Sequence, residues 1–379
     1  CDDDVIEAIP KLDTHSGWTY IVTGNRSKGE NLDGVFQTWL AESSKACELG
    51  TFNKPILPGT RTQGSGEFSD KGEFTHTCKH KTRLVSMVDF YQILAELRFA
   101  KPFQKVMADK RFYAGGKNTR DISSIIANMR ATYSEYVSLD YSAFDQSISS
   151  WLIYDAFDVI KSAFGEITGS DLSLWNAIVH DFVHKTFISK NGTVSSHKGV
   201  PSGSMFTQII DSLVNRIMIE TFLISQSIKG EMIIMGDDNL LYYTCEGSNV
   251  DIRDRVASYL TKNFGVKCNE SKSSYGSRFQ NPEFLSREWR RGGAWRHPRI
   301  LISKLLFSER FRFYDEQSTP ELVIYSYILA YGLGMQEFLD VRQFLLDYDF
   351  NPNMLKMLDS RNLPGILSSL IRHEKDFGS

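Results

Sequence analysis

Three aspartates stand where short apolar segments end, and carboxylates in such places are ligands for divalent cations. Asp237 and Asp238 follow Gly236 between two apolar stretches, which predicts two strands joined by a tight acidic turn. Adjacent carboxylates repel each other unless cations neutralise them. Asp140 ends another apolar stretch, and two Mg²⁺ ions need oxygen ligands from at least two chain segments besides substrate phosphates. We therefore predict that Asp140, Asp237 and Asp238 bind two Mg²⁺ or Mn²⁺ ions, which would activate a hydroxyl for attack on a phosphate.

The elements expected around these aspartates mix short strands with long helices, which indicates an α+β layered fold. Strands are predicted at 136–139, 232–235 and 240–243, and a hairpin at 187–195 that turns at Asn191-Gly192. Apolar residues at helical spacing predict helices at 89–97, 151–164, 206–224 and 250–263, and a helical tail from Thr319 onward. Residues 1–75 are expected to be rich in loops, and 284–291 to form a strand that enters a turn at Gly292-Gly293.

The composition is that of a globular protein with room for two or three subdomains. The chain has 379 residues, of which 41% are hydrophobic and 23% charged, with a formal net charge of -3. A nucleic-acid enzyme with this charge would have to concentrate its basic residues in a channel. No apolar stretch reaches the roughly 20 residues that span a bilayer, so no membrane partner is expected. The five scattered cysteines are typical of reduced thiols rather than of a disulfide framework.

Three segments follow one another in a characteristic order. They are Leu-Asp-Tyr-Ser-Ala-Phe-Asp at 139–145, Pro-Ser-Gly-Ser-Met-Phe-Thr at 201–207 with Asn215 beyond it, and Met-Gly-Asp-Asp at 235–238. These segments resemble motifs A, B and C of viral RNA-dependent RNA polymerases, and motifs A and B are most similar to those of double-stranded RNA viruses of the partitivirus and picobirnavirus kind. The resemblance implies RNA-templated transfer of nucleotides by a two-metal mechanism and a right-hand fold of fingers, palm and thumb.

The resemblance also implies a role for individual residues. Asp140 and Asp237 would bind both metals, with Asp238 as an auxiliary ligand. Asp145, together with Ser202 and Thr207 of motif B, would recognise the ribose 2′-hydroxyl, because only hydrogen-bonding groups can favour ribose over deoxyribose. Gly203, between two serines, would give motif B a flexible turn.

One departure from the family pattern leaves the partner of Asp145 open. Many relatives carry Asn four residues after the motif B threonine, where this chain has Asp211. Two carboxylates near one hydroxyl need a shared proton, a water or a cation. Asn215, one helical turn later, is the alternative source of an amide, and the sequence does not decide between Asp211 and Asn215.

Basic residues are expected to contact phosphates. Lys79, Lys81 and Arg83 resemble motif F, which meets the incoming triphosphate. Lys272 resembles the motif D lysine that acts as a general acid toward pyrophosphate, with Lys267 as a competing candidate. Arg287, in a segment similar to motif E, would hold the growing strand.

Three other functions fit the sequence less well. A reverse transcriptase places a bulky aromatic residue five positions after the first motif A aspartate, where this chain has Asp145. A non-catalytic RNA-packaging protein would be expected to lose its metal carboxylates, because an unneutralised acidic cluster costs stability. A metal-dependent nuclease would not explain the motif B turn, the ribose-sensing aspartate and the motif F basic residues together.

The family likeness finally implies a domain plan and a set of partners. Fingers are expected at 1–130 with an insertion at 157–197, an antiparallel palm flanked by helices at 131–156 and 198–291, and a helical thumb at 292–379. The expected partners are an RNA template, the product strand and NTPs, and a viral capsid protein stays open as a further one. The expected location is the host cytoplasm, within or beside the virus particle, where a viral RNA genome is transcribed and replicated.

Overall fold

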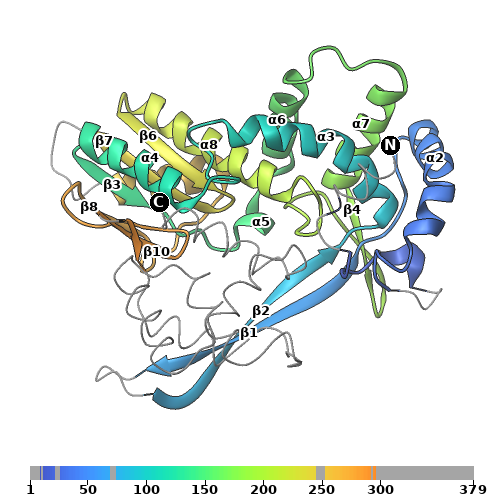
Figure 1. Ribbon diagram of the computed structural model, residues 1–379, viewed down its shortest axis with the longest axis horizontal. Coiled ribbons are helices and arrows are strands. Elements are labelled where there is room, and N and C mark those ends of the chain that lie inside the picture. The colour runs from blue at the N-terminus through green and yellow to red at the C-terminus, as the bar shows by residue number, and fades with distance from the viewer. Residues whose placement is uncertain are drawn as a thin grey trace, which may run out of the picture. The chain divides into compact units, whose positions relative to one another are not determined.

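The structure is a computed structural model that describes residues 9, 12–21, 26–68, 74–244, 252–291 and 293–295, without the side chains of 63–80 (Figure 1). The chain divides into two compact units, which are described separately. The first contains residues 1–60, 84–115 and 137–275, and the second contains 61–83, 116–136 and 276–379. The predicted helical tail from Thr319, and Gly292 of the predicted turn, lie outside the described residues.

One sheet has four strands in the order β6-β7-β3-β8; β6 and β7 lie in the first unit, and β3 and β8 each have residues in both units. Its strands are β3 (Glu135–Ser138), β6 (Lys229–Met235), β7 (Asp238–Thr244) and β8 (Ser274–Ser277). β6 and β7 are antiparallel, and Met235 pairs with Asp238 across a two-residue turn. The strands predicted at 136–139, 232–235 and 240–243 are confirmed, and the predicted acidic turn joins two of them.

Helices of the first unit pack on this sheet and on one another. They are α2 (Leu32–Leu49), α3 (Phe90–Ala108), α5 (Phe144–Ser147), α6 (Ser150–Ser162), α7 (Gly169–Val183), α8 (Thr207–Ser225) and α9 (Ile252–Phe264), with a short 3₁₀ turn at Trp18–Tyr20. α8 packs on β6 and also contacts α6 and α9 (Figure 1). The helices predicted at 89–97, 151–164, 206–224 and 250–263 are confirmed as α3, α6, α8 and α9.

Aromatic side chains join α3, α6, α7 and α8 into one core. The Phe157 ring makes edge-to-face contacts with Trp175, Phe182 and Phe206, with centroids 5.7, 5.0 and 5.2 Å away. The same Trp175 ring meets Phe99 of α3 edge-on at 5.2 Å. Each such pair contributes about 0.5–1.5 kcal/mol beyond the burial of its area. This core supports the helix that follows motif B.

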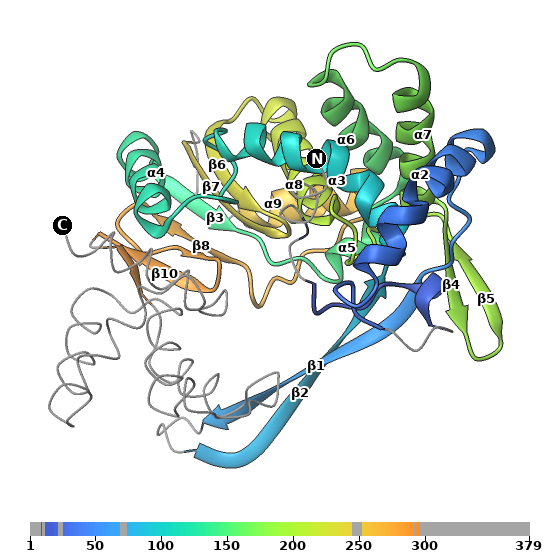
Figure 2. The same cartoon turned by 45° about the vertical axis from the view of Figure 1, so that its right-hand side comes forward.

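Two hairpins accompany this core. β4 (Lys185–Ser189) and β5 (Gly192–Ser196) form the hairpin predicted at 187–195 (Figure 2). The turn lies one residue earlier than predicted, because Gly192, with φ of 118°, pairs with Ser189 as the first residue of β5. β1 (Leu57–Phe68) and β2 (Phe74–Met87) form a longer hairpin that contributes residues to both units.

The described part of the second unit combines α4 (Thr119–Thr132) with a small sheet. Its strands are β9 (Glu283–Phe284), β10 (Arg287–Arg290) and β11 (Gly293–Trp295). The single strand predicted at 284–291 is wrong, because Leu285 and Ser286 have φ of 56° and 55° and reverse the chain. A two-residue hairpin turn with positive φ at both positions matches the twist of the flanking strands.

The expectation that residues 1–75 are rich in loops is also wrong. They contain the 18-residue helix α2 and the 12-residue strand β1. Asn31 precedes α2, and Gly50 ends it with φ of 70°, which is the left-handed ending that glycine favours. Within the described residues, no helix combines the length and the apolar character needed to cross a bilayer.

Candidate active site

Side chains of α8 form hydrogen bonds with the backbone of the turn that carries Asp237. The Nδ2 of Asn215 donates to the carbonyl oxygens of Gly236 and Asp237 at 3.0 and 3.2 Å. The Gly236 N–H donates to the Oγ of Ser212 at 2.8 Å, and Gly236 itself has φ of 65°, which glycine adopts without strain. The backbone of the turn is therefore fixed, while the side chains of Asp237 and Asp238 are exposed.

A buried asparagine ties the end of β3 to the same turn. The Oδ1 of Asn239 accepts from the Leu139 N–H at 3.1 Å, and its Nδ2 donates to the Leu139 carbonyl at 3.1 Å and the Asp237 carbonyl at 3.3 Å. The Oγ of Ser138 donates to the Asn239 carbonyl at 2.9 Å. Asn239 is only 1% exposed, so these bonds form away from competing water. Asp140, the next residue after Leu139, is thereby placed beside the turn of Asp237.

The segment after α9 fixes Asp140 from a second direction. The Asp140 N–H donates to Ser273 Oγ at 3.0 Å, and the Asp140 carbonyl accepts from the Asn269 N–H at 2.6 Å. Cys268, in the same segment, has a thiol pKa raised to about 12, first by burial and then by the charge of Asp140. The thiol therefore stays protonated and adds no negative charge beside the aspartate.

Asp211 lies buried on α8 and faces two other carboxylates. Its side chain is 4% exposed, and its Oδ1 has no hydrogen-bond partner. Burial raises the pKa of this carboxyl well above its usual value, and the negative charges of Asp145 and Asp237 raise it further. Burial and these neighbouring charges therefore favour the neutral, protonated form of Asp211, in which its O–H is a hydrogen-bond donor.

Both polar side-chain atoms of Asn215 form hydrogen bonds inside the protein. It has no exposed surface, and its Oδ1 accepts from the Tyr141 hydroxyl at 2.8 Å while its Nδ2 holds the turn of Asp237. The Tyr141 ring stacks on Phe144 with centroids 4.7 Å apart. Every polar atom of the Asn215 side chain thus has a partner, which distinguishes it from Asp211.

The motif B loop lies tightly against the end of β2. Ser202 Oγ accepts from the Ser86 N–H at 2.9 Å. A Cβ placed on Gly203 would overlap the Ser86 carbonyl oxygen, a backbone atom that cannot swing aside. Thr207 Oγ1 donates within the loop, to the carbonyls of Pro201 at 2.7 Å and Ser204 at 2.9 Å. Close backbone approach is thus a reason for glycine at 203, besides the flexibility that we predicted.

Comparison with known proteins shows the family to which the chain belongs. A family model described as viral RNA-dependent RNA polymerase matches residues 3–306. The chain belongs to this family. The RNA-directed RNA polymerase of Cryptosporidium parvum virus 1 (strain KSU-1) is 26% identical over 145 residues, which cover 37% of this chain and 27% of that protein. The RNA-directed RNA polymerase of Atkinsonella hypoxylon virus (isolate 2H) is 34% identical over 122 residues, which cover 30% of this chain and 18% of that protein.

Solved structures show the same fold. The crystal structure of the RNA-dependent RNA polymerase of a human picobirnavirus matches with a TM-score of 0.68 and 17% sequence identity, covering 100% of this chain and 70% of that one. The predicted α+β right-hand polymerase fold is therefore confirmed, as is the family inferred from motifs A, B and C. The chain spans 27% and 18% of the two curated viral relatives named above.

Viral polymerases of this family use divalent metal ions, and the donors near the turn suit them. Among the described residues, no three carboxylate, imidazole or thiol groups converge into a complete metal cage. Mg²⁺ characteristically takes only one or two protein carboxylates and completes its octahedron with waters and substrate phosphates. The exposed carboxylates of Asp237 and Asp238, beside the half-buried Asp140, fit that partial ligand set.

Glu96 was missed by the sequence analysis, although it holds the motif B loop. Its Oε2 accepts from Ser204 Oγ and from the Met205 N–H, both at 2.8 Å, and its Oε1 accepts from Gln92 Nε2 at 3.0 Å. Burial raises the pKa of Glu96 to about 7, and these hydrogen bonds moderate the rise. The only sequence signal was a charged residue among apolar neighbours in α3, which a solvated position explains equally well.

The predicted basic residues are not all placed with the carboxylates. Lys81 and Arg83 are exposed on β2 in the second unit, and the side chain of Lys79 lies outside the described residues. Lys267 and Lys272 are both exposed in the first unit, so the choice between them stays open. Arg287 belongs to the second unit, where its Nη1 donates to Thr119 Oγ1 at 3.2 Å.

Proposed function

We propose that the chain is the catalytic part of an RNA-dependent RNA polymerase that transfers nucleotides from NTPs to the 3′ end of a growing RNA strand. The observation that carries this proposal is the network of Asn215 and Asn239, which fixes the backbone around Asp140 and Asp237 and leaves the carboxylates of the turn exposed. Rigid positioning of a few oxygen donors is what two-metal chemistry needs.

In this proposal Asp140 and Asp237 bind the ions, and Asp238 assists. When bound, two divalent ions lower the pKa of the attacking 3′-hydroxyl and neutralise charge on the leaving pyrophosphate. The chain's own contribution is position: Asn239 holds the two ligand-bearing segments together, and Ser273 and Asn269 hold Asp140 from the other side. A lysine, either Lys272 or Lys267, would protonate the pyrophosphate. Lys79, Lys81 and Arg83 would contact the triphosphate, and Arg287 the product strand.

We infer that Asp211 rather than Asn215 is the partner of Asp145 in recognising ribose. Asn215 has all its polar atoms engaged, whereas Asp211 is a buried carboxyl in the field of Asp145 with one free oxygen. A protonated Asp211 has the shape of asparagine and, like it, combines a hydrogen-bond donor with a carbonyl acceptor. It would therefore orient the Asp145 carboxylate toward the 2′-hydroxyl without repelling it. Ser202 and Thr207 shape the loop beside this pair.

The test is incorporation of labelled NTPs on an RNA template with Mg²⁺ or Mn²⁺. Asp237→Asn removes one charge at the turn with almost no change in shape, and product should fall to background. Asp158→Asn, which changes an exposed aspartate on α6, is the matched control and should retain activity. Full activity of Asp237→Asn would refute the metal assignment, and template-independent product would refute the proposed function.

The biological setting follows from the same proposal. The relatives named above come from viruses, and we propose that the chain copies a viral RNA genome in the cytoplasm of the host. Association with the virus particle or with a capsid protein is part of this proposal. Sedimentation of polymerase activity with purified particles would support it, and activity found only in the soluble fraction would contradict it.

A further inference from the structure

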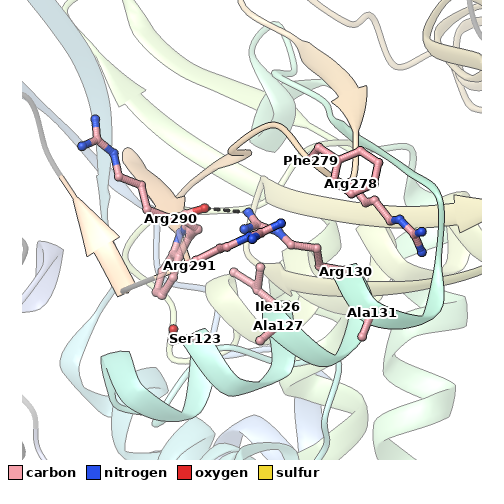
Figure 3. Close-up of a pocket in the computed structure, with 10 residues that line it drawn as sticks. Ser123, Ile126, Ala127, Arg130, Ala131, Arg278, Phe279, Arg290 and Arg291 are labelled. Carbon is pink, nitrogen blue, oxygen red and sulfur yellow. Dashed lines mark hydrogen bonds between the residues drawn. The ribbon is translucent and has the colours of Figure 1, made fainter.

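The second unit contains a pocket that none of the polymerase motifs A, B and C contributes to. Its volume is about 320 Å³, and it lies between α4 and the β10 region (Figure 3). Ile126 and the buried Trp289 supply apolar lining, while Arg130, Arg278, Arg290 and Arg291 supply four guanidinium groups. Among the residues of this lining that the structure describes, none carries a carboxylate. The described lining is therefore strongly basic, which suits an anionic ligand.

Two of the arginines converge. In Figure 3 the guanidinium groups of Arg130, from α4, and Arg291, just after β10, point toward each other within the pocket. Arg130 is fixed there, because its Nη2 donates to the Trp289 carbonyl at 2.8 Å and more weakly to the Gln280 carbonyl at 3.4 Å. Arg291 is exposed and has no ion pair with any described residue. An anion placed between these two guanidinium groups would be attracted by both of them.

The other two arginines have different surroundings. Arg290 forms an ion pair with Glu288, with Nε and Oε1 3.0 Å apart, and its guanidinium lies 3.7 Å from the centroid of the Trp295 ring. Arg278 lies over the ring of Phe279 at 5.1 Å. Figure 3 shows both side chains directed away from the pair formed by Arg130 and Arg291. The anion-binding capacity of the pocket therefore rests on Arg130 and Arg291, with Arg278 at the rim.

The geometry favours phosphate over carboxylate. Each guanidinium presents a planar fork that takes two oxygens, so a carboxylate satisfies one fork, whereas a phosphate has oxygens for two. The pocket volume lies at the lower end of the range for small-molecule sites, which suits a mononucleotide or the end of a strand rather than a duplex. Phe279, at the rim, is 71% exposed and offers a face on which a base can stack.

We propose that this pocket is a second phosphate-binding site, which takes the phosphate of a nucleotide between Arg130 and Arg291 and the attached base on Phe279. The phosphate can belong to a free nucleotide or to the 5′ end of an RNA strand. The site contains none of the carboxylates of the candidate active site and does not depend on the function proposed for them.

The experiment measures binding without divalent cations, so that no metal links a phosphate to the aspartates. The full chain is titrated in EDTA with AMP, with inorganic phosphate, with succinate, and with a short RNA carrying either a 5′-phosphate or a 5′-hydroxyl. The variants are Arg291→Gln, which removes one guanidinium, and Arg120→Gln, which removes an exposed arginine of α4 outside the pocket. Thermal melting first establishes that both variants are folded.

The proposal predicts that Arg291→Gln weakens AMP binding about tenfold, because a charge-assisted bidentate contact is lost, and that Arg120→Gln leaves it unchanged. Phe279→Ala should weaken AMP binding but not phosphate binding. A preference for 5′-phosphorylated over 5′-hydroxyl RNA would identify a strand end as the ligand, and binding of AMP alone would identify a free nucleotide. Equal losses in both arginine variants, equal binding of succinate, or no binding of any phosphate would overturn the proposal.

Discussion

Glu96 should make the stability of the protein depend on pH, because it is a buried carboxyl group with a raised pKa. Replacement with glutamine keeps the shape of the side chain and removes its charge. The Oε1 of the new glutamine can accept the hydrogen bonds from Ser204 Oγ and the Met205 N–H. The side-chain amide of Gln92 can rotate so that its oxygen accepts from the new Nε2. The variant should therefore fold and keep the motif B loop in place.

The size of the expected pH effect on the free energy of unfolding follows from the pKa of Glu96. Glu96 has a pKa of about 7 in the folded protein against 4.5 in the unfolded chain. The folded state therefore holds its proton more firmly, and this contribution to stability is complete below pH 4.5 and is lost as the pH rises through 7. At about 1.4 kcal/mol for each pH unit between these values, wild type should lose about 3 kcal/mol relative to Glu96→Gln between pH 4.5 and pH 8.

The assay is urea denaturation of both proteins at several pH values, with the difference in free energy of unfolding plotted against pH. Other titrating groups are shared and cancel in the difference. Glu166→Gln, at an exposed position, is the matched control and should give a nearly flat plot because water already solvates its carboxylate. A flat plot for Glu96→Gln, or a wild type that gains stability relative to it as the pH rises, would refute the argument that burial dominates at this site.

Three further outcomes are expected. Asp237→Asn should lower nucleotide incorporation roughly a thousandfold, since metal binding contributes several kcal/mol to the transition state; steady-state incorporation measures this. Gly203→Ala should cost about 1–3 kcal/mol of stability and slow incorporation, because its Cβ would overlap the Ser86 carbonyl; a variant with wild-type melting would contradict this. Asp211→Leu should reduce the preference for NTPs over dNTPs about tenfold, whereas Asp211→Asn should keep it, as competition assays would show. Equal preferences in the two Asp211 variants would exclude a hydrogen-bonding role for this residue.

The sequence predicted three strands of the sheet, β3, β6 and β7, and the helices α3, α6, α8 and α9, because their patterns are local. The strands on either side of Asp237 and the helix after motif B each carry an apolar period that short-range rules detect. The turn at Leu285-Ser286 was not predicted, because two ordinary residues adopt positive φ there and no glycine or asparagine marks the position. Helix α2 was missed among polar residues, although Asn31 and Gly50 at its ends were available as signals.

The candidate site shows the same difference between what local patterns predict and what only the folded chain brings together. The motifs predicted which residues could take part in the reaction. The residues that position these motifs lie far away in the chain, and no sequence motif marks them. Glu96 reaches Ser204 across 108 positions, and Asn239 reaches Leu139 across 100. Their distant partners are backbone groups and one hydroxyl, which any sequence supplies, so only the fold reveals the pairing.

The same difference in hydrogen bonding is the basis for the different roles that we propose for Asp211 and Asn215, one helical turn apart on α8. Asn215 is satisfied on every polar atom, and its loss would release the turn of Asp237. Asp211 is buried without a complete set of partners, an arrangement that costs free energy and is retained where a ligand completes it. The unsatisfied oxygen therefore favours Asp211, rather than Asn215, as the residue that would orient Asp145 toward the substrate.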